Sequence, residues 1–208
     1  MDDGGRSGGA PALSPEDVLE GLSEIAKRIE GCRRCPLFRH RTRTVPGEGS
    51  GDSGIVVIGE APGKEEDASG RPFVGRAGRI LRSAMADAGL DPGRAFITNA
   101  VKCRPPGNRR PTRQELEACR PWLEAQLRIL RPRAVVVLGN TALDSLSGIL
   151  GLRTTIRELM DAPLRAACPW GECWVLGAYH PAYTRFNRRV PEILRKTFER
   201  ALKIVRGD

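Results

Sequence analysis

The chain has 208 residues, of which 40% are hydrophobic and 28% are charged, values that are typical of one globular domain. No run of about 18 apolar residues occurs, which excludes a transmembrane helix, and the N-terminal segment has no apolar core, so we expect no signal peptide. The net charge is +9, and residues 21–208 carry 33 basic against 20 acidic side chains. A basic body favours a polyanionic partner such as nucleic acid, although an arginine-rich solvated surface gives the same count.

The N-terminal part of the chain predicts a tail followed by a helix. Residues 1–13 are rich in glycine and have little apolar content, which is typical of disorder, so we expect a single domain over residues 14–208. Ser14 is a typical N-cap and Pro15 a typical first helical residue. The apolar residues that recur on one face of this helix are Val18, Leu22, Ile25 and Ile29.

Four short apolar runs further along the chain predict strands, over residues 55–58, 95–98, 134–138 and 174–176. Helical patterns separate them, including a capping box, Thr112 with Glu115, that opens a helix reaching about Leu130. Residues 151–172 show no clear pattern. The alternation predicts an α/β fold of three layers, α/β/α, with a central, mostly parallel, four-stranded sheet.

Polar motifs follow three of these strands. The loop Gly59–Gly63 follows the first strand, Asn99 ends the second, and His180 comes just after the fourth. Ligand sites in such sheets lie beyond the carboxyl ends of the strands, so we expect these motifs to meet at one edge.

Gly59–Gly63, Asn99 and a further residue, Phe73, each have a structural interpretation and a functional one. The glycines of Gly59–Gly63 permit close approach of a ligand to the backbone, or simply a turn. Phe73 is either a core residue or a platform on which a base stacks. The Asn99 amide can read a base edge, because it has both a donor and an acceptor, or it can cap the strand. The His180 imidazole can hydrogen-bond a developing negative charge.

The chain has six cysteines. Cys32 and Cys35 form a C-x2-C turn directly after the first helix, and Cys103 and Cys119 follow later. Four thiolates suit a structural zinc ion or a [4Fe–4S] cluster, and spacing alone does not separate these from unrelated buried cysteines. We assign no function to Cys168 and Cys173.

The joint pattern of motifs resembles the family 4 uracil-DNA glycosylases. The segments that carry the resemblance, in chain order, are GEAPG (59–63), GRPFVG (70–75), TNAVKCRPPGNR (98–109) and HPA (180–182). The likeness extends over roughly residues 20–205. It implies a monofunctional glycosylase of base excision repair that releases uracil from DNA. It also implies that the four cysteines ligate a [4Fe–4S] cluster.

The resemblance also implies roles for individual residues. Phe73 would stack on the extruded uracil, Asn99 would bind its imide edge, and His180 would face its O2 atom. Other uracil-binding residues expected from the resemblance are Gly59, Glu60, Ala61 and Gly63. We expect His180, Glu60, Asn99 and Glu66 to be catalytic. Ala61 stands where the better-known family 1 enzymes have a water-activating Asp, so either Glu66, Asp67 or Asn99 would orient the water, or the DNA phosphates would carry more of the stabilisation.

Basic and aromatic residues near these motifs are candidates for contact with DNA. We expect Arg104, Arg109, Arg110 and Arg185 to contact phosphates, although a solvated surface is the plainer interpretation. The family usually has a leucine wedge after His-Pro-Ala, and here Tyr183 and Phe186 follow instead. The loop 107–111 lacks the His through which a related subfamily traps uracil, so we predict turnover and no permanent adduct.

Two other functions remain open on the sequence. One is a non-catalytic DNA-binding module with a structural cluster, and the other is a glycosylase for a different deaminated base. We expect uracil-containing DNA, single- or double-stranded, as the partner, with no membrane association, a monomeric state, and a cytoplasmic location near the nucleoid.

Overall fold

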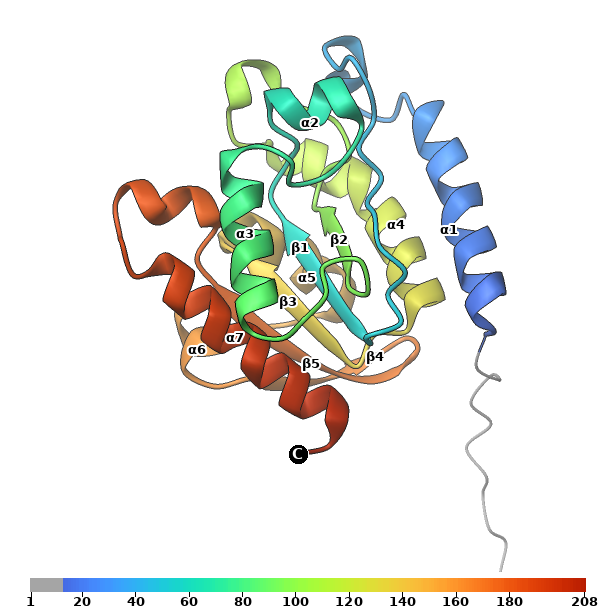
Figure 1. Ribbon diagram of the computed structural model, residues 1–208. Coiled ribbons are helices and arrows are strands. Elements are labelled where there is room, and N and C mark those ends of the chain that lie inside the picture. The colour runs from blue at the N-terminus through green and yellow to red at the C-terminus, as the bar shows by residue number, and fades with distance from the viewer. Residues whose placement is uncertain (1–12) are drawn as a thin grey trace, which may run out of the picture.

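The computed structural model describes residues 13–208 (Figure 1). All but Leu13 of the predicted tail therefore lies outside the described residues. Five strands form one sheet in the order β2-β1-β3-β5-β4. Their bounds are β1 Ile55–Gly59, β2 Phe96–Asn99, β3 Ala134–Leu138, β4 Leu164–Cys168 and β5 Gly171–Ala178. The α/β class and the mostly parallel sheet are confirmed, because β2, β1, β3 and β5 pair in parallel.

The prediction of four strands was wrong. β4 lies in the segment 151–172, which showed no pattern, and pairs antiparallel with β5 at the edge of the sheet. Only Ala166 of β4 is fully buried, so the strand lacks the continuous apolar run by which the inner strands are recognised. β5 also begins earlier than the predicted strand over 174–176, because residues 171–173 pair with β4 and only the last of them, Cys173, is buried.

Helices cover both faces of the sheet (Figure 1). Their bounds are α1 Pro15–Glu30, α2 Lys64–Ser69, α3 Arg76–Asp87, α4 Arg113–Leu130, α5 Asn140–Leu150, α6 Ile156–Asp161 and α7 Val190–Arg206. Alternate residues of β1 point to opposite faces: Ile55 and Val57 pack in the core that contains α3 and α7, and Val56 and Ile58 in the core that contains α4 and α5. The three-layer prediction is therefore confirmed.

The predicted helix starts are also confirmed. The Ser14 side chain caps α1 by accepting from the Asp17 N–H, and Thr112 caps α4 in the same way through Glu115. α1 packs outside α4, and a third, smaller core lies at the Cys32 end of α1. No helix within residues 13–208 is long and apolar enough to span a bilayer.

The strand order fixes where a ligand site forms. β2 lies on one side of β1 and β3 on the other, so the chain changes direction at β1. Loops that leave β1 and β3 diverge there and open a crevice beyond the carboxyl ends of the strands.

Candidate active site

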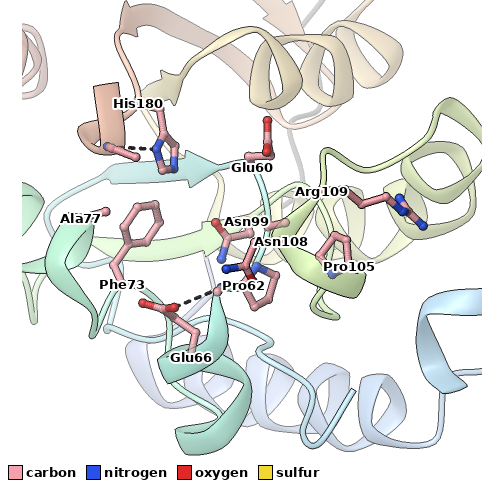
Figure 2. Close-up of a pocket in the computed structure, with 13 residues that line it drawn as sticks. Glu60, Pro62, Glu66, Phe73, Ala77, Asn99, Pro105, Asn108, Arg109 and His180 are labelled. Atoms are coloured by element: carbon pink, nitrogen blue, oxygen red, sulfur yellow. Dashed lines mark hydrogen bonds between the residues drawn. The ribbon is translucent and has the colours of Figure 1, made fainter. Parts of the chain in front are cut away.

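A pocket of about 320 Å³ occupies this crevice (Figure 2). That volume lies in the range of small-molecule sites. It is lined by Glu60, Ala61, Pro62, Gly63, Glu66, Phe73, Ala77, Asn99, Pro105, Asn108, Arg109, His180 and Ala182. The loop after β1, the end of β2 and the segment after β5 therefore meet at one edge, as the strand pattern predicts.

Asn99 carries an unpaired polar atom at the pocket. The residue is 2% exposed, and its Oδ1 has no hydrogen-bond partner within the described chain. An orphaned buried acceptor costs about 1–3 kcal/mol, so it persists where something else repays the cost. Gly59 pairs with Asn99 in the sheet, and a Cβ on Gly59 would lie 2.5 Å from that Oδ1 and 2.4 Å from the Phe73 ring. Only glycine at position 59 leaves room for both side chains.

Phe73 forms one wall of the pocket and has a strained backbone. Its φ is +51°, which a bulky residue rarely adopts and which costs roughly 1–3 kcal/mol. Arg82 holds it there, because Nε donates to the Phe73 carbonyl (3.1 Å) and the guanidinium also pairs with Glu48. Gly78 permits the fold of the loop, since a Cβ at that position would lie 1.9 Å from the Phe73 oxygen.

The Glu66 carboxylate holds the loop that follows Phe73. Its Oε1 accepts from the backbone N–H groups of Val74 (3.0 Å) and Gly75 (2.9 Å), and its Oε2 accepts from that of Gly63 (3.0 Å). Asp67 is engaged similarly, accepting from the Thr42 N–H (2.9 Å). Both carboxylates, which the sequence analysis offered as water-orienting groups, are thus committed to backbone donors. The spacing of these residues in the sequence gave no sign of that.

His180 stands opposite Phe73, with ring centroids 5.9 Å apart (Figure 2). Its Nδ1 accepts from the Ala182 N–H (3.3 Å), so the neutral ring carries its proton on Nε2. Burial lowers the pKa of His180 below its usual value, against the opposing influence of the charges on Glu60 and Glu66. The ring is therefore a neutral N–H donor near pH 7.

Glu60 lines the pocket, and Figure 2 shows it beside His180 with its carboxylate directed away from Asn99. Its Oε2 accepts from the Thr141 hydroxyl (2.5 Å), and that hydroxyl in turn accepts from Arg110 Nε (2.7 Å). The other oxygen, Oε1, has no hydrogen-bond partner within residues 13–208. Thr141 opens α5, and no motif in the sequence linked it to the loop after β1.

Three of the four predicted phosphate-binding arginines, Arg104, Arg109 and Arg110, have partners within the chain. Arg109 makes a bidentate pair with the buried Glu115 (2.7 and 2.8 Å), and it alone among these arginines lines the pocket. Arg104 donates to Asn108 Oδ1 (2.7 Å), and Arg110 lies 3.5 Å from Asp144. The basic loop is therefore partly neutralised by residues of its own fold.

The segment after His180 presents aromatic side chains to solvent. Tyr183 is 45% exposed and Phe186 is 80% exposed. Tyr179, Tyr183 and Phe186 form a row, with successive ring centroids 5.1 and 5.6 Å apart. Arg185 is exposed on the same turn and lines a hollow that adjoins the pocket at Ala77 and Ala182. Exposed aromatics of this size are unusual on a soluble surface unless they meet a partner.

The four cysteines with the noted spacing come together around one small cavity, although they belong to three separate segments. That cavity is lined by Cys32, Cys35, Cys103 and Cys119. Three of the sulfurs accept hydrogen bonds. Cys32 accepts from Trp122 Nε1 (3.2 Å), Cys103 from the Arg41 guanidinium (3.2 Å) and Cys119 from the Lys102 backbone N–H (3.3 Å). Within residues 13–208 no group of three or more His, Cys, Asp or Glu side chains is placed to hold a single metal ion.

A buried lysine lies between the cysteines and the pocket. Lys102 is 1% exposed, and its Nζ donates to Thr98 Oγ1 (2.6 Å), the Asn99 carbonyl (2.9 Å) and Gln126 Oε1 (2.8 Å). Burial lowers the pKa of Lys102 to about 8 and raises the pKa of the Cys119 thiol to about 12. Lys102 was not predicted as part of the site, because a lysine beside a cysteine in the sequence carries no signal of burial.

Comparison with known proteins agrees with the geometry of the site. The model of the uracil-DNA glycosylase superfamily matches residues 46–205. A type-4 uracil-DNA glycosylase from Thermotoga maritima is 39% identical over 93% of this chain and 97% of its own length. A type-4 uracil-DNA glycosylase from Archaeoglobus fulgidus is 37% identical over 88% of this chain and 92% of its own length. A type-4 uracil-DNA glycosylase from Pyrobaculum aerophilum is 47% identical over 64% of this chain and 67% of its own length.

The chain belongs to the type-4 uracil-DNA glycosylases. The matched range of the superfamily model includes every pocket motif and also Cys103 and Cys119. Cys32 and Cys35 precede that range. The superfamily model therefore covers only two of the four clustered cysteines, and the two that follow α1 lie outside its range.

Proposed function

We propose that this protein excises uracil from DNA by hydrolysing the N-glycosidic bond of deoxyuridine, which leaves an abasic site for base excision repair. The observation that carries the proposal is the unpaired, buried Oδ1 of Asn99, in a pocket walled by an aromatic ring. A base must leave the double helix to enter such a pocket, and extrusion costs least where pairing is already weak.

Asn99 and Phe73 supply recognition of the base. Uracil has an N3–H donor beside its O4 acceptor. The Asn99 Oδ1 accepts from N3–H, and the amide N–H of the same side chain donates to O4. Phe73, fixed by its strained backbone and by Arg82, provides a flat apolar surface for the ring. Binding of uracil thus supplies the partner that Asn99 lacks.

His180 stabilises the leaving group. Cleavage of the bond leaves negative charge on uracil and positive charge on the sugar. The Nε2–H of the neutral imidazole donates to uracil O2, where this charge accumulates. The Ala182 N–H fixes the tautomer through Nδ1, so the proton is already in place before the reaction. Removal of one such donor typically costs about 10²–10³ in kcat.

Glu60 is the carboxylate available to orient the attacking water. Glu66 and Asp67 are engaged by backbone N–H groups, whereas Glu60, which also lines the pocket, keeps one oxygen without a partner in the described chain. Thr141 and Arg110 hold the other oxygen and fix the direction of the side chain. The water oxygen bonds to C1′ of the sugar, the C1′–N1 bond breaks, and the released proton passes to solvent.

The cysteine cavity is suited to a [4Fe–4S] cluster held by Cys32, Cys35, Cys103 and Cys119. Each iron of such a cluster takes one thiolate, so its ligands surround the cluster and do not converge on one ion. N–H groups directed at three of the sulfurs favour the anionic form that a cluster requires. When bound, the cluster supplies a cross-link between the turn after α1, the loop after β2 and α4.

We further propose that residues 14–208 act as a single domain and as a monomer on uracil-containing DNA. The exposed aromatic row reaches the duplex, where Tyr183 or Phe186 fills the gap left by the extruded base. Because the loop 107–111 has no histidine, the enzyme turns over and forms no permanent adduct with its product.

Uracil release from a labelled oligonucleotide tests the function directly. Strand breakage at the abasic site after alkali is the readout, and oligonucleotides with thymine, cytosine or hypoxanthine at the same position are controls. We expect breakage with uracil and repeated turnover. A cluster-loaded preparation that cleaves none of the substrates would contradict the proposal. Cleavage of hypoxanthine in preference to uracil would contradict the assigned base.

A further inference from the structure

A second basic surface lies away from the pocket. Seven of the residues between Lys27 and Arg43 are basic, and one, Glu30, is acidic. Arg41 points inward to Cys103 and to the Cys32 carbonyl. The other six are exposed, and none of them makes an ion pair within residues 13–208. These six, which we call the arginine patch, are Lys27, Arg28, Arg33, Arg34, Arg39 and Arg43.

The patch differs from the basic segment beside the pocket, residues 104–113. There Arg109 and Arg113 are each paired with a glutamate of α4. Cations that repel one another and lack counter-charges in the fold destabilise the free protein unless a polyanion neutralises them. The concentration of unpaired positive charge is therefore greater on the patch than on the loop that the sequence analysis assigned to DNA.

Aromatic rings hold four cations of the patch in place. Arg28 and Arg34 lie 5.5 and 4.9 Å from the ring centroid of Trp122. Two others, Arg33 and Arg39, lie 5.8 and 5.6 Å from that of Phe38. Cation–π contacts of this kind restrict the side chains before any ligand binds, which lowers the entropic cost of gripping a phosphate.

The patch adjoins the end of the molecule that holds the pocket. The Thr42 N–H donates to Asp67 of α2, next to the pocket residue Glu66, and the Val45 N–H donates to the Lys102 carbonyl (2.8 Å). Figure 1 shows the segment that follows α1 beside α2, at the end of the sheet to which β1 points. DNA that places one nucleotide in the pocket has its neighbouring phosphates over this end.

We propose that the arginine patch is a second DNA-binding surface, which grips backbone phosphates of the substrate beyond the extruded nucleotide. The proposal rests on the proposed function, since it assumes that DNA enters the pocket. Phosphate contacts carry no sequence information, so the patch adds affinity for any long DNA strand. It adds nothing for a substrate too short to reach it.

Salt-dependent binding tests the patch. The ligand is an undamaged duplex of about 30 base pairs, titrated between about 50 and 200 mM salt. Two double variants, Arg33→Gln with Arg39→Gln and Arg28→Gln with Arg34→Gln, keep the side-chain stems and remove the charges. The slope of log K against log salt is negative, and each lost phosphate contact reduces its magnitude by about 0.9, so each double variant should reduce the magnitude by about 1.8. Lys203→Gln with Arg206→Gln, exposed at the far end of α7, is the matched control and should keep the wild-type slope.

A second assay separates this proposal from the proposed function. The patch variants should keep the wild-type kcat/KM on a deoxyuridine trinucleotide, whose phosphates all flank the extruded nucleotide. Absence of excision by the wild-type protein would contradict the proposed function. The salt dependence of binding would still show whether the arginine patch contacts DNA. Unchanged slopes in both patch variants, or an equal fall in the α7 control, would overturn the patch. The two pairs of arginines stack on different aromatic rings. If one double variant fails to fold, the salt dependence of the other still tests the arginine patch.

Discussion

The pocket and the cysteine cavity share the segment from Asn99 to Cys103, yet they differ in whether their polar atoms have hydrogen-bond partners. On the pocket side, Asn99 Oδ1 is buried with no partner, and Glu60 keeps one oxygen unengaged. On the cysteine side, Lys102 has an acceptor for each of its three protons, and three sulfurs accept N–H groups. A site that must bind and release a substrate retains unmet hydrogen-bonding capacity, whereas a site that holds the fold together uses its capacity fully.

The largest effect on activity is expected at Asn99. Asn99→Ala removes both groups that read the uracil edge, so kcat/KM should fall about 10³-fold or more. The melting temperature should not fall, because the deleted Oδ1 has no partner to lose. Single-turnover excision and thermal unfolding of the same preparation measure the two effects. A fall in melting temperature with unchanged kcat/KM would make Asn99 a structural residue.

His180→Ala should lower kcat by about 10²–10³. Burial lowers the pKa of His180, so the ring stays neutral as the pH falls to the usual pKa of histidine. Wild-type kcat should therefore stay constant down to that pH and decline only in more acidic solution. Glu60→Gln removes a charge that raises this pKa and should move the decline to still lower pH. A rise in wild-type kcat on acidification would show that the imidazolium is the active form.

The exposed aromatic row should matter only for duplex substrates. Phe186→Ala or Tyr183→Ala removes a side chain that fills the gap in the stack, so excision from a U·A duplex should fall about tenfold. Excision from single-stranded DNA has no gap to fill and should keep its rate. If both variants excise duplex uracil at the wild-type rate, the aromatic row is not the wedge.

Changes at the cysteine cavity should affect stability and leave the chemistry nearly intact. Trp122→Phe removes the N–H donated to Cys32 and weakens the contacts with Arg28 and Arg34. We expect a loss of roughly 1–2 kcal/mol, which lowers Tm by about 2–8 °C in a chain of this length. With saturating protein, the single-turnover rate of excision per folded molecule should change less than about threefold, because Trp122 does not line the pocket and saturation removes any loss of affinity at the arginine patch. Visible absorption of the bound cluster monitors its retention, and unchanged Tm would count against the structural role.

The sequence predicted the site better than it predicted what supports the site. Strand ends are local patterns, so the convergence of Gly59–Gly63, Asn99 and His180 followed from the fold class. The supports are contacts between distant segments, such as Arg82 with Phe73 or Arg41 with Cys103, and no spacing rule reports these. Edge strand β4 was missed for a related reason, since its exposed residues carry no core pattern.

The central claim is that the two regions divide the work, with chemistry at the pocket and stability at the cysteines. Single-turnover excision of uracil, measured alongside thermal unfolding for Asn99→Ala and Trp122→Phe, tests it most directly. We predict that Asn99→Ala loses the rate and keeps its Tm, and that Trp122→Phe loses Tm and keeps its rate. The reverse pattern, or loss of both properties in both variants, would contradict the claim.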